Sequence, residues 1–244
     1  MKIFKEIFAR IWALWSLVLF ISTMFIAVIF YLPLMLMPFK KAAQWHRMVS
    51  KIWMFVYLNL IGCPIRIKGK EHFKVNENYI IVCNHNSLMD IPITTPFLPQ
   101  ANKTIAKKSF SKVPIFGWIY SWGSVLVDRK NVESRKKSYE AMKKVLKQKV
   151  DMLIFPEGSR NKTENPLRPF YDGAFKLAHD TGKKIIPVLL FNTKKILPQN
   201  KNFYVMPHEI RMEILPPVNT DDVTFNELKE KVFRIMWDYF EANK

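Results

Sequence analysis

An uncharged run near the start of the sequence constrains the fold most. No charged side chain occurs from Ile11 to Phe39, and residues 17–30 are dense in Leu, Ile, Val, Phe and Met. A helix needs ~20 apolar residues to cross a bilayer, so this run is long enough to do so. It is also too long for the apolar part of a secretory signal peptide, and no small-residue cleavage site follows it. We therefore expect a membrane-associated helical segment.

The sequence does not determine how this apolar run passes through the membrane. Basic residues flank both of its ends, so the positive-inside rule gives no orientation. Pro33 and Pro38 allow a break near its far end, because a proline interrupts the hydrogen bonds of a helix. A single span and a re-entrant or monotopic hairpin are both compatible with this pattern.

The next stretch, Ala42 to Leu60, carries aromatic and aliphatic residues at helical spacing, interrupted by a few polar ones. Such a helix suits a membrane interface, where aromatic rings lie at headgroup depth and cations face lipid phosphates. A core helix of the soluble part is the alternative. The chain leaves this apolar region near Gly62, which predicts a membrane-associated helical region over residues 1–62 and a second domain over residues 63–244.

Residues 63–244 alternate strand-like and helix-like segments. Several of the strand-like runs are continuous in Val, Ile and Leu, as expected for strands covered on both faces. These runs are Ile65–Ile67, Tyr79–Cys83, Thr104–Ala106, Ser124–Asp128, Met152–Phe155, Ile185–Phe191 and Ile210–Leu215. The helix-like segments are Val132–Lys149, Tyr171–His179 and Val223–Glu241. This alternation predicts an α/β fold, with a mainly parallel sheet flanked by helices.

The balance of charges indicates an anionic partner. The formal net charge is +18, from 38 Lys and Arg against 20 Asp and Glu. A surplus of this size attracts nucleic acid, an acidic membrane surface or an anionic substrate. Composition does not choose among these three.

The spacing of the cysteines and histidines does not indicate a metal site or a disulfide bond. Cys63 and Cys83 have neither disulfide nor zinc-ligand spacing, and we expect both to be small buried hydrophobic residues. The remaining histidines also lack metal-ligand spacing and are expected at the surface or at an interface. They are His46, His72, His179 and His208.

A histidine and a carboxylate follow one of the strand candidates. Residues 84–90, Asn-His-Asn-Ser-Leu-Met-Asp, place His85 five positions before Asp90. Histidine titrates nearest neutrality, and a neighbouring carboxylate holds its tautomer and stabilises its protonated form, so the pair can act as a general base. The spacing alone also fits an incidental His beside a helix-capping Asp. Because five positions in an ideal helix turn through about 500°, we expect His85 before the helix or in its first turn, with its ring folded toward Asp90.

Cations follow two other strand candidates, where open α/β sheets bind their ligands. Lys107 begins a basic segment after one strand, and the sequence Phe-Pro-Glu-Gly-Ser-Arg, residues 155–160, follows another. The planar guanidinium of Arg160 suits a phosphate. No Gly-x-Ser-x-Gly elbow is present that would make Ser87 or Ser159 the nucleophile of a hydrolase.

Four blocks of residues occur in order along the chain. They are His85 to Asp90; Lys107, Phe110, Pro114, Gly117, Gly123 and Arg129; Phe155 to Arg160; and Pro187 with Val188. In these blocks the sequence resembles the 1-acylglycerol-3-phosphate acyltransferases of the wider glycerolipid acyltransferase group. The similarity spans about residues 60–220 and includes Tyr171-Asp172-Gly173-Ala174. Ser159 stands where the family usually has threonine, a change that keeps the hydroxyl group.

The resemblance implies an acyltransferase that needs no cofactor and no metal. It would move a fatty acyl group from acyl-CoA or acyl carrier protein to the free hydroxyl of 1-acylglycerol 3-phosphate, giving phosphatidic acid. His85 would be the base that deprotonates this hydroxyl. Asp90 would orient His85 and stabilise its charged form.

The resemblance also implies a set of substrate-binding residues. Arg160 and Lys107 would grip the acceptor phosphate. Glu157 would contact the glycerol part or brace its loop, which includes Gly158 and Ser159. Arg129 would touch the acceptor or pair with Asp128 or Glu157.

Two rival functions stay open. A related acyltransferase that uses glycerol 3-phosphate, another lysophospholipid or an aminolipid would carry the same motifs. A non-catalytic basic protein that binds membranes or nucleic acid would explain the charge and the apolar run. It would not explain residues 155–160, and no nucleic-acid-binding signature is present, so we expect no nucleic-acid partner.

The expected partners are lysophosphatidic acid, an acyl thioester donor and a membrane lipid surface. Because acyl donors are made in the cytosol, we expect a membrane protein whose catalytic domain lies on the cytoplasmic face. Asn102 and Asn161 begin formal glycosylation sequences, which we therefore expect to be unused.

Overall fold

The computed structural model describes residues 2–128, 130–221 and 223–244, so Arg129 and its two predicted roles lie outside the described residues. Within them the chain forms a seven-stranded sheet in the order β1-β7-β6-β2-β5-β3-β4. The strands are β1 (Ile65–Lys68), β2 (Ile80–Cys83), β3 (Asn102–Lys107), β4 (Ser124–Val127), β5 (Asp151–Ile154), β6 (Ile185–Phe191) and β7 (Ile210–Ile214). Every strand candidate of the sequence is thus confirmed, with ends that shift by a residue or two.

The sheet is mainly parallel, as predicted. Neighbouring strands run parallel except β6 and β7, which pair antiparallel. The central strands β2 and β6 are buried along their whole length. Their continuous apolar runs follow from this position, because helices cover both of their faces.

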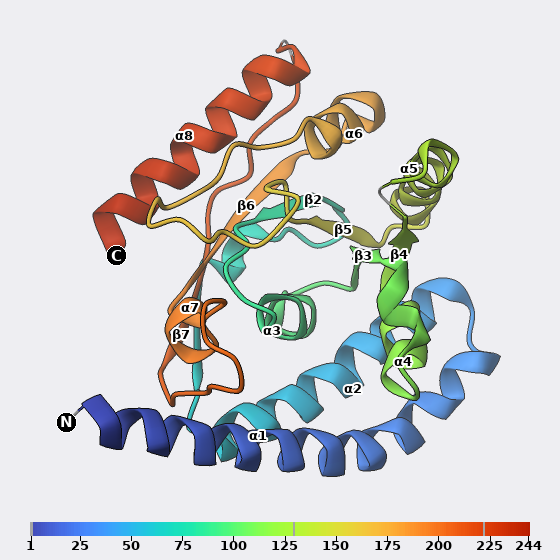
Figure 1. Cartoon of the computed structure of the whole chain (residues 1–244). Coiled ribbons are helices and arrows are strands. Elements are labelled where there is room, and N and C mark those ends of the chain that lie inside the picture. The colour runs from blue at the N-terminus through green and yellow to red at the C-terminus, as the bar shows by residue number, and fades with distance from the viewer. Residues whose placement is uncertain (1, 129, 222) are drawn as a thin grey trace.

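Helices cover the two faces of the sheet (Figure 1). One face carries α2 (Phe39–Leu60), α3 (Asp90–Phe97) and α4 (Phe116–Trp122), and the other carries α5 (Val132–Lys147), α6 (Gly173–Thr181) and α8 (Phe225–Asn243). The three predicted helices after residue 130 are confirmed as α5, α6 and α8. Shorter elements are α7 (Thr193–Ile196), η2 (Lys70–His72) and η3 (Lys108–Lys112), which span too few residues for helical periodicity to be recognised.

The core is divided by the sheet into two apolar clusters. Successive side chains of a strand point to opposite faces, so Ile81 and Cys83 of β2 pack toward α2 and α3. Ile80 and Val82 pack toward α5, α6 and α8. Both cysteines are buried free thiols, as predicted.

The N-terminal region is a helical hairpin along one side of the sheet (Figure 1). It consists of α1 (Lys2–Tyr31), η1 (Leu32–Leu36) and α2, so the break predicted from Pro33 and Pro38 is present. Side-chain hydrogen bonds hold α1 against α2, from Trp53 Nε1 to Thr23 Oγ1 at 2.9 Å and between the hydroxyls of Tyr31 and Ser50 at 2.6 Å. Residues 2–36 are long and apolar enough to be a candidate membrane segment.

The hairpin exposes a broad apolar surface, which we call the apolar face. It comprises Ile7, Ile11, Leu14, Val18, Phe25, Ile26, Ile29 and Phe30 of α1 with Ile52, Phe55 and Val56 of α2. The opposite side of α2, including Val49 and Leu58, is buried in the core. The core alternative is therefore confirmed for the inner side of α2, and the membrane interface stays a prediction for its exposed side.

The prediction for His46 is wrong. This residue is buried and 7% exposed, whereas His72, His179 and His208 retain exposed area. Its ring occupies the space left by Gly123, where a Cβ atom would lie 2.7 Å from the ring, and Nε2 is 3.1 Å from the carbonyl of Ile119. Burial lowers the pKa of His46 to about 4, so the ring is neutral at neutral pH and donates this bond from Nε2.

Candidate active site

The predicted histidine and carboxylate meet at the carboxyl end of β2. Residues 84–89 form a loop, and α3 begins at Asp90. His85 Nδ1 lies 2.8 Å from Asp90 Oδ2, so the expected position of His85 before the helix and the folding of its ring toward Asp90 are confirmed. The same oxygen accepts hydrogen bonds from the backbone N–H groups of Asn86, at 2.6 Å, and Ser87, at 2.7 Å.

This arrangement fixes the tautomer of His85. A carboxylate accepts from Nδ1–H, which leaves Nε2 with the lone pair that a base needs. Asp90 is fully buried, whereas the His85 side chain is 16% exposed and packs on Phe155 with ring centroids 4.5 Å apart. Among the described residues Nε2 has no hydrogen-bond partner, so it is available to an incoming hydroxyl.

The neighbouring loop holds the backbone of His85. Strands β2 and β5 are parallel neighbours, so the loops that follow them lie at the same edge of the sheet. Glu157 accepts hydrogen bonds from His85 N at 2.8 Å and from Arg168 N at 3.1 Å, while Asn161 N donates to the His85 carbonyl at 2.6 Å. The peptide groups on both sides of the His85 side chain are therefore fixed.

Glu157 is buried and 1% exposed, with each carboxylate oxygen occupied by a backbone donor. These contacts match bracing of the loop, the second of its two predicted roles. Burial raises the pKa of Glu157 to about 7, although the two backbone N–H donors act in the opposite direction.

The two predicted phosphate-binding cations, Arg160 and Lys107, lie at different distances from His85. Arg160 adjoins Asn161 and is partly buried, and its guanidinium makes no hydrogen bond or ion pair with the rest of the described chain. Lys107 is the exposed last residue of β3, which lies two strands from β2, roughly 10 Å away. Arg160 thus belongs to the His85 cluster, and Lys107 lies at its margin.

Gly158 and Ser159 shape the loop between these groups. Gly158 has φ of +69°, and a Cβ atom there would lie 2.6 Å from the ring of Tyr171. A glycine is therefore required both by the backbone conformation and by the close approach of the ring. The hydroxyl of Ser159 accepts a hydrogen bond from the guanidinium of Arg168.

Two residues of this cluster were missed at the level of sequence, Arg168 and Gln199. Gln199 Nε2 donates to the carbonyls of Asn86, at 2.9 Å, and Asn161, at 3.1 Å. Both residues lie in irregular segments outside the motif blocks. No periodicity or spacing points to them, because their place depends on how distant loops pack.

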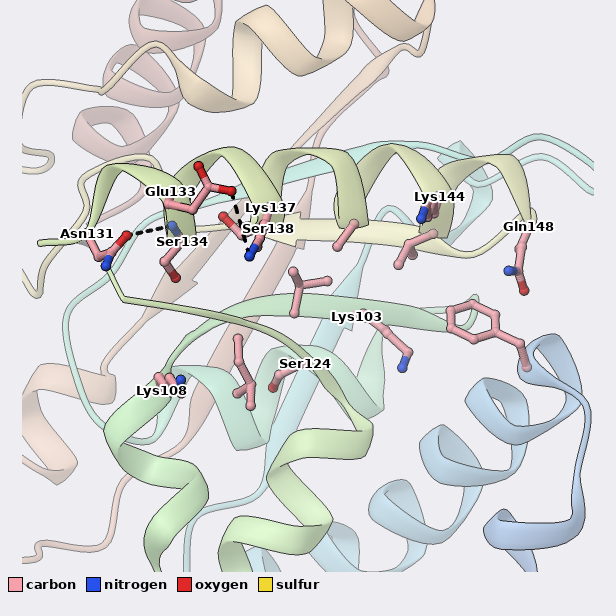
Figure 2. Close-up of a pocket in the computed structure, with 15 residues that line it drawn as sticks. Lys103, Lys108, Ser124, Asn131, Glu133, Ser134, Lys137, Ser138, Lys144 and Gln148 are labelled. Atoms are coloured by element: carbon pink, nitrogen blue, oxygen red, sulfur yellow. Dashed lines mark hydrogen bonds and ion pairs between the residues drawn. The ribbon is translucent and has the colours of Figure 1, made fainter.

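A groove of about 760 Å³ lies apart from this cluster, between α5 and the strands β3 and β4 at one end of the sheet (Figure 2). Its lining combines lysines with apolar residues such as Val125 and Val145. The lysines that line it are Lys103, Lys108, Lys137 and Lys144. None of the predicted site residues that the structure describes lines the groove.

Comparison with known proteins identifies the family of the chain. Residues 64–190 match the family model described as Acyltransferase. A 1-acyl-sn-glycerol-3-phosphate acyltransferase of Salmonella typhimurium is 32% identical over 179 residues, which cover 70% of this chain and 69% of that protein. The chain belongs to the 1-acyl-sn-glycerol-3-phosphate acyltransferase family. The resemblance seen in the four sequence blocks is thereby confirmed.

Other acyltransferases of this family are longer than the chain. The Cocos nucifera protein of the same name is 35% identical over 165 residues, 67% of this chain and 52% of its own length. The chain spans about half to two thirds of the length of the plant and yeast relatives that it matches.

A solved structure shows the same fold. It is the 1-acyl-sn-glycerophosphate (LPA) acyltransferase PlsC from Thermotoga maritima, with a TM-score of 0.82 and 22% identity. The match covers 99% of this chain and 97% of that one. The N-terminal hairpin and the sheet domain are therefore both parts of the shared architecture.

Proposed function

We propose that the protein transfers a fatty acyl group from an acyl thioester to the free hydroxyl of 1-acylglycerol 3-phosphate, producing phosphatidic acid at a membrane surface. The observation that carries the proposal is the 2.8 Å contact of His85 with the buried Asp90, beside Arg160, in a chain of this family. Acyl-CoA and acyl carrier protein both present such a thioester, and either serves as co-substrate.

In this reaction His85 is the general base. Nε2 takes the proton of the acceptor hydroxyl as its oxygen attacks the thioester carbonyl carbon. The tetrahedral intermediate collapses with cleavage of the carbon–sulfur bond, and the imidazolium returns the proton to the leaving thiolate. Asp90 stabilises the positive charge of His85 between these steps, because its carboxylate remains hydrogen-bonded to Nδ1.

In this proposal Arg160, in the loop after β5, and Lys107 bind the acceptor. Arg160 lies next to the loop that holds His85, and its guanidinium has no described partner with which a phosphate would compete. A guanidinium binds two phosphate oxygens at once, so Arg160 would fix the orientation of the acceptor. Lys107 would add charge attraction from the margin of the site.

The hairpin supports attachment to one leaflet of a membrane. Contacts hold α1 against α2 at several points along its length, and the apolar face is free on the outside. If α1 crossed the bilayer perpendicular to its plane, it would have to leave α2, and these contacts would be lost. We therefore favour the monotopic alternative, with the catalytic domain on the cytoplasmic side. Asn102 and Asn161 are each 2% exposed, which supports their expected lack of glycosylation.

The test is an assay of the purified protein with vesicles that contain lysophosphatidic acid and either acyl-CoA or acyl carrier protein as donor. Mass spectrometry should detect phosphatidic acid with at least one donor, and His85→Ala should abolish its formation while circular dichroism shows a retained fold. A parallel assay with glycerol 3-phosphate in place of lysophosphatidic acid tests the rival acceptor. Absence of phosphatidic acid with both donors would refute the proposal.

A further inference from the structure

The chain between α7 and β7 connects the candidate active site to the N-terminal hairpin. We call residues 197–206 the strap. On one side the strap contacts the loop that carries His85, because the hydroxyl of Ser87 donates to the carbonyl of Leu197 at 3.1 Å. Gln199 adds the two hydrogen bonds to the carbonyls of Asn86 and Asn161.

On its other side the strap contacts α1. Lys201 forms an ion pair with Glu6, and its ammonium group lies 4.3 Å from the centre of the Tyr204 ring. Val205 N donates to the carbonyl of Ala9 at 3.2 Å. Figure 1 shows this segment lying over the N-terminal half of α1. Side-chain and backbone bonds therefore join the strap to the hairpin.

The bonds of Gln199 complete a closed circuit around His85. Asn161 N donates to the His85 carbonyl, and Gln199 Nε2 donates both to the Asn161 carbonyl and to that of Asn86, the residue after His85. A primary amide nitrogen supplies two N–H donors, which matches the two carbonyls. A carboxylate has the same shape but no donor, so glutamate cannot replace it.

We propose that Gln199 is a positioning residue for the acyl transfer, and that the strap makes the position of His85 depend on how α1 is seated in the membrane. This inference rests on the proposed function. When α1 shifts relative to the domain, Lys201 and Val205 move with it, and the Gln199 bonds transmit the displacement to the peptide groups on either side of His85. Correct seating of the hairpin thus holds the base in its working geometry.

The first test uses Gln199→Ala and Gln199→Glu in the full chain. Loss of two hydrogen bonds in this circuit should lower kcat about tenfold, while KM for both substrates stays within about twofold, because a positioning residue acts on His85 and not on bound substrate. Gln100→Ala is the matched control, since Gln100 Nε2 donates to the Lys74 carbonyl at 2.8 Å on an exposed surface. The control should keep wild-type kinetics.

Thermal unfolding separates positioning from folding in this test. The proposal requires the fall in kcat at temperatures where the Gln199 variants remain fully folded. Unchanged kcat, or a rise in KM alone, would overturn it. A wild-type protein that forms no phosphatidic acid would instead refute the proposed function, so the two failures are distinguishable.

The second test exchanges the charges of the strap and α1. Glu6→Lys and Lys201→Glu alone each place like charges together, and each should lower kcat on vesicles about threefold, whereas the double exchange should restore it. Glu133→Lys, in an exposed pair on α5, is the control for altered surface charge. Vesicle sedimentation is measured in parallel. If the single variants lose only vesicle binding and keep kcat when bound, the coupling is refuted.

Discussion

At the scale of the residue, Asp90 organises the site. One of its oxygens receives the imidazole Nδ1–H of His85 and two backbone N–H groups, all from the loop that precedes α3. Hydrogen bonds to a carboxylate are shorter and stronger than those between neutral groups. These bonds fold the loop before α3 around the Asp90 carboxylate. They hold the His85 imidazole in one orientation before a substrate binds.

Substitution of Arg160 tests acceptor binding at the same scale. Arg160→Ala should raise KM for lysophosphatidic acid by roughly tenfold to a hundredfold, since a charge-assisted hydrogen bond contributes about 1.5–3 kcal/mol, and should change kcat little. Arg160→Lys should lie between, because lysine keeps the charge but loses the planar fork. Steady-state kinetics on vesicles measures both constants, with Arg135→Ala on the exposed side of α5 as control. An unchanged KM in Arg160→Ala would remove this residue from the phosphate site.

At the scale of the element, buried strands fix the loops that carry chemistry. β2 and β5 are hydrogen-bonded neighbours, and they end in the loops of His85 and Glu157. The starts of β2 and β5 are also joined by a hydrogen bond, because Asp151 Oδ1 accepts from Tyr79 N at 2.8 Å. Asp151 is almost fully buried, and burial raises its pKa to about 7.

This carboxyl predicts a pH dependence of stability. In the unfolded chain Asp151 ionises near its ordinary pKa of 3.8, whereas in the folded protein it ionises near 7. Between these values the unfolded chain has released a proton that the folded protein keeps, so the free energy of unfolding falls as pH rises.

Asp151→Asn keeps an oxygen for the Tyr79 N–H and cannot ionise. Between about pH 4 and about pH 8 the wild-type protein should therefore lose about 4 kcal/mol more stability than the variant. Denaturant unfolding in detergent at several pH values measures this difference. Glu157 titrates in both proteins and cancels from the comparison. Parallel pH profiles would show that folding does not raise the pKa of Asp151.

At the scale of the whole molecule, the hairpin gives the domain a broad exposed apolar surface, which would meet lipid in the proposed function. The apolar face lies on the outer side of α1 and α2, while their inner sides join the core. A basic surplus of +18 would add attraction to anionic lipids. The site, which receives a lipid acceptor in the proposed reaction, lies in the sheet domain against which the hairpin packs.

Charges placed on the apolar face should release the protein from vesicles. Ile26 and Ile29 are 61% and 62% exposed, and each contributes about 1.5–3 kcal/mol when buried in an apolar phase. The double variant Ile26→Glu, Ile29→Glu should bind vesicles at least about a hundredfold more weakly in a sedimentation assay. Val75→Glu is the control, because Val75 is 86% exposed but lies outside the hairpin. Equal losses in the control and the double variant would exclude a specific role of this face.

The sequence by itself determined the local structure of this protein. Strand-like runs, several of them continuously apolar, located all seven strands. Periodic and uncharged runs located the long helices, and two prolines located the break in the hairpin. The short separation of His85 and Asp90, together with the four-block resemblance, predicted their contact. These features depend on neighbouring residues and on backbone periodicity, which a sequence displays directly.

Only the tertiary structure decided which distant residues meet. Gln199 and Asn86 are 113 positions apart, and no local pattern marks a glutamine whose amide fits two carbonyls of other loops. The burial of His46 depends on the gap at Gly123, and the bracing role of Glu157 depends on backbone groups of two other segments. The order of the strands and the docking of α1 on α2 likewise follow from packing of surfaces, because many chain paths satisfy the same hydrophobic pattern.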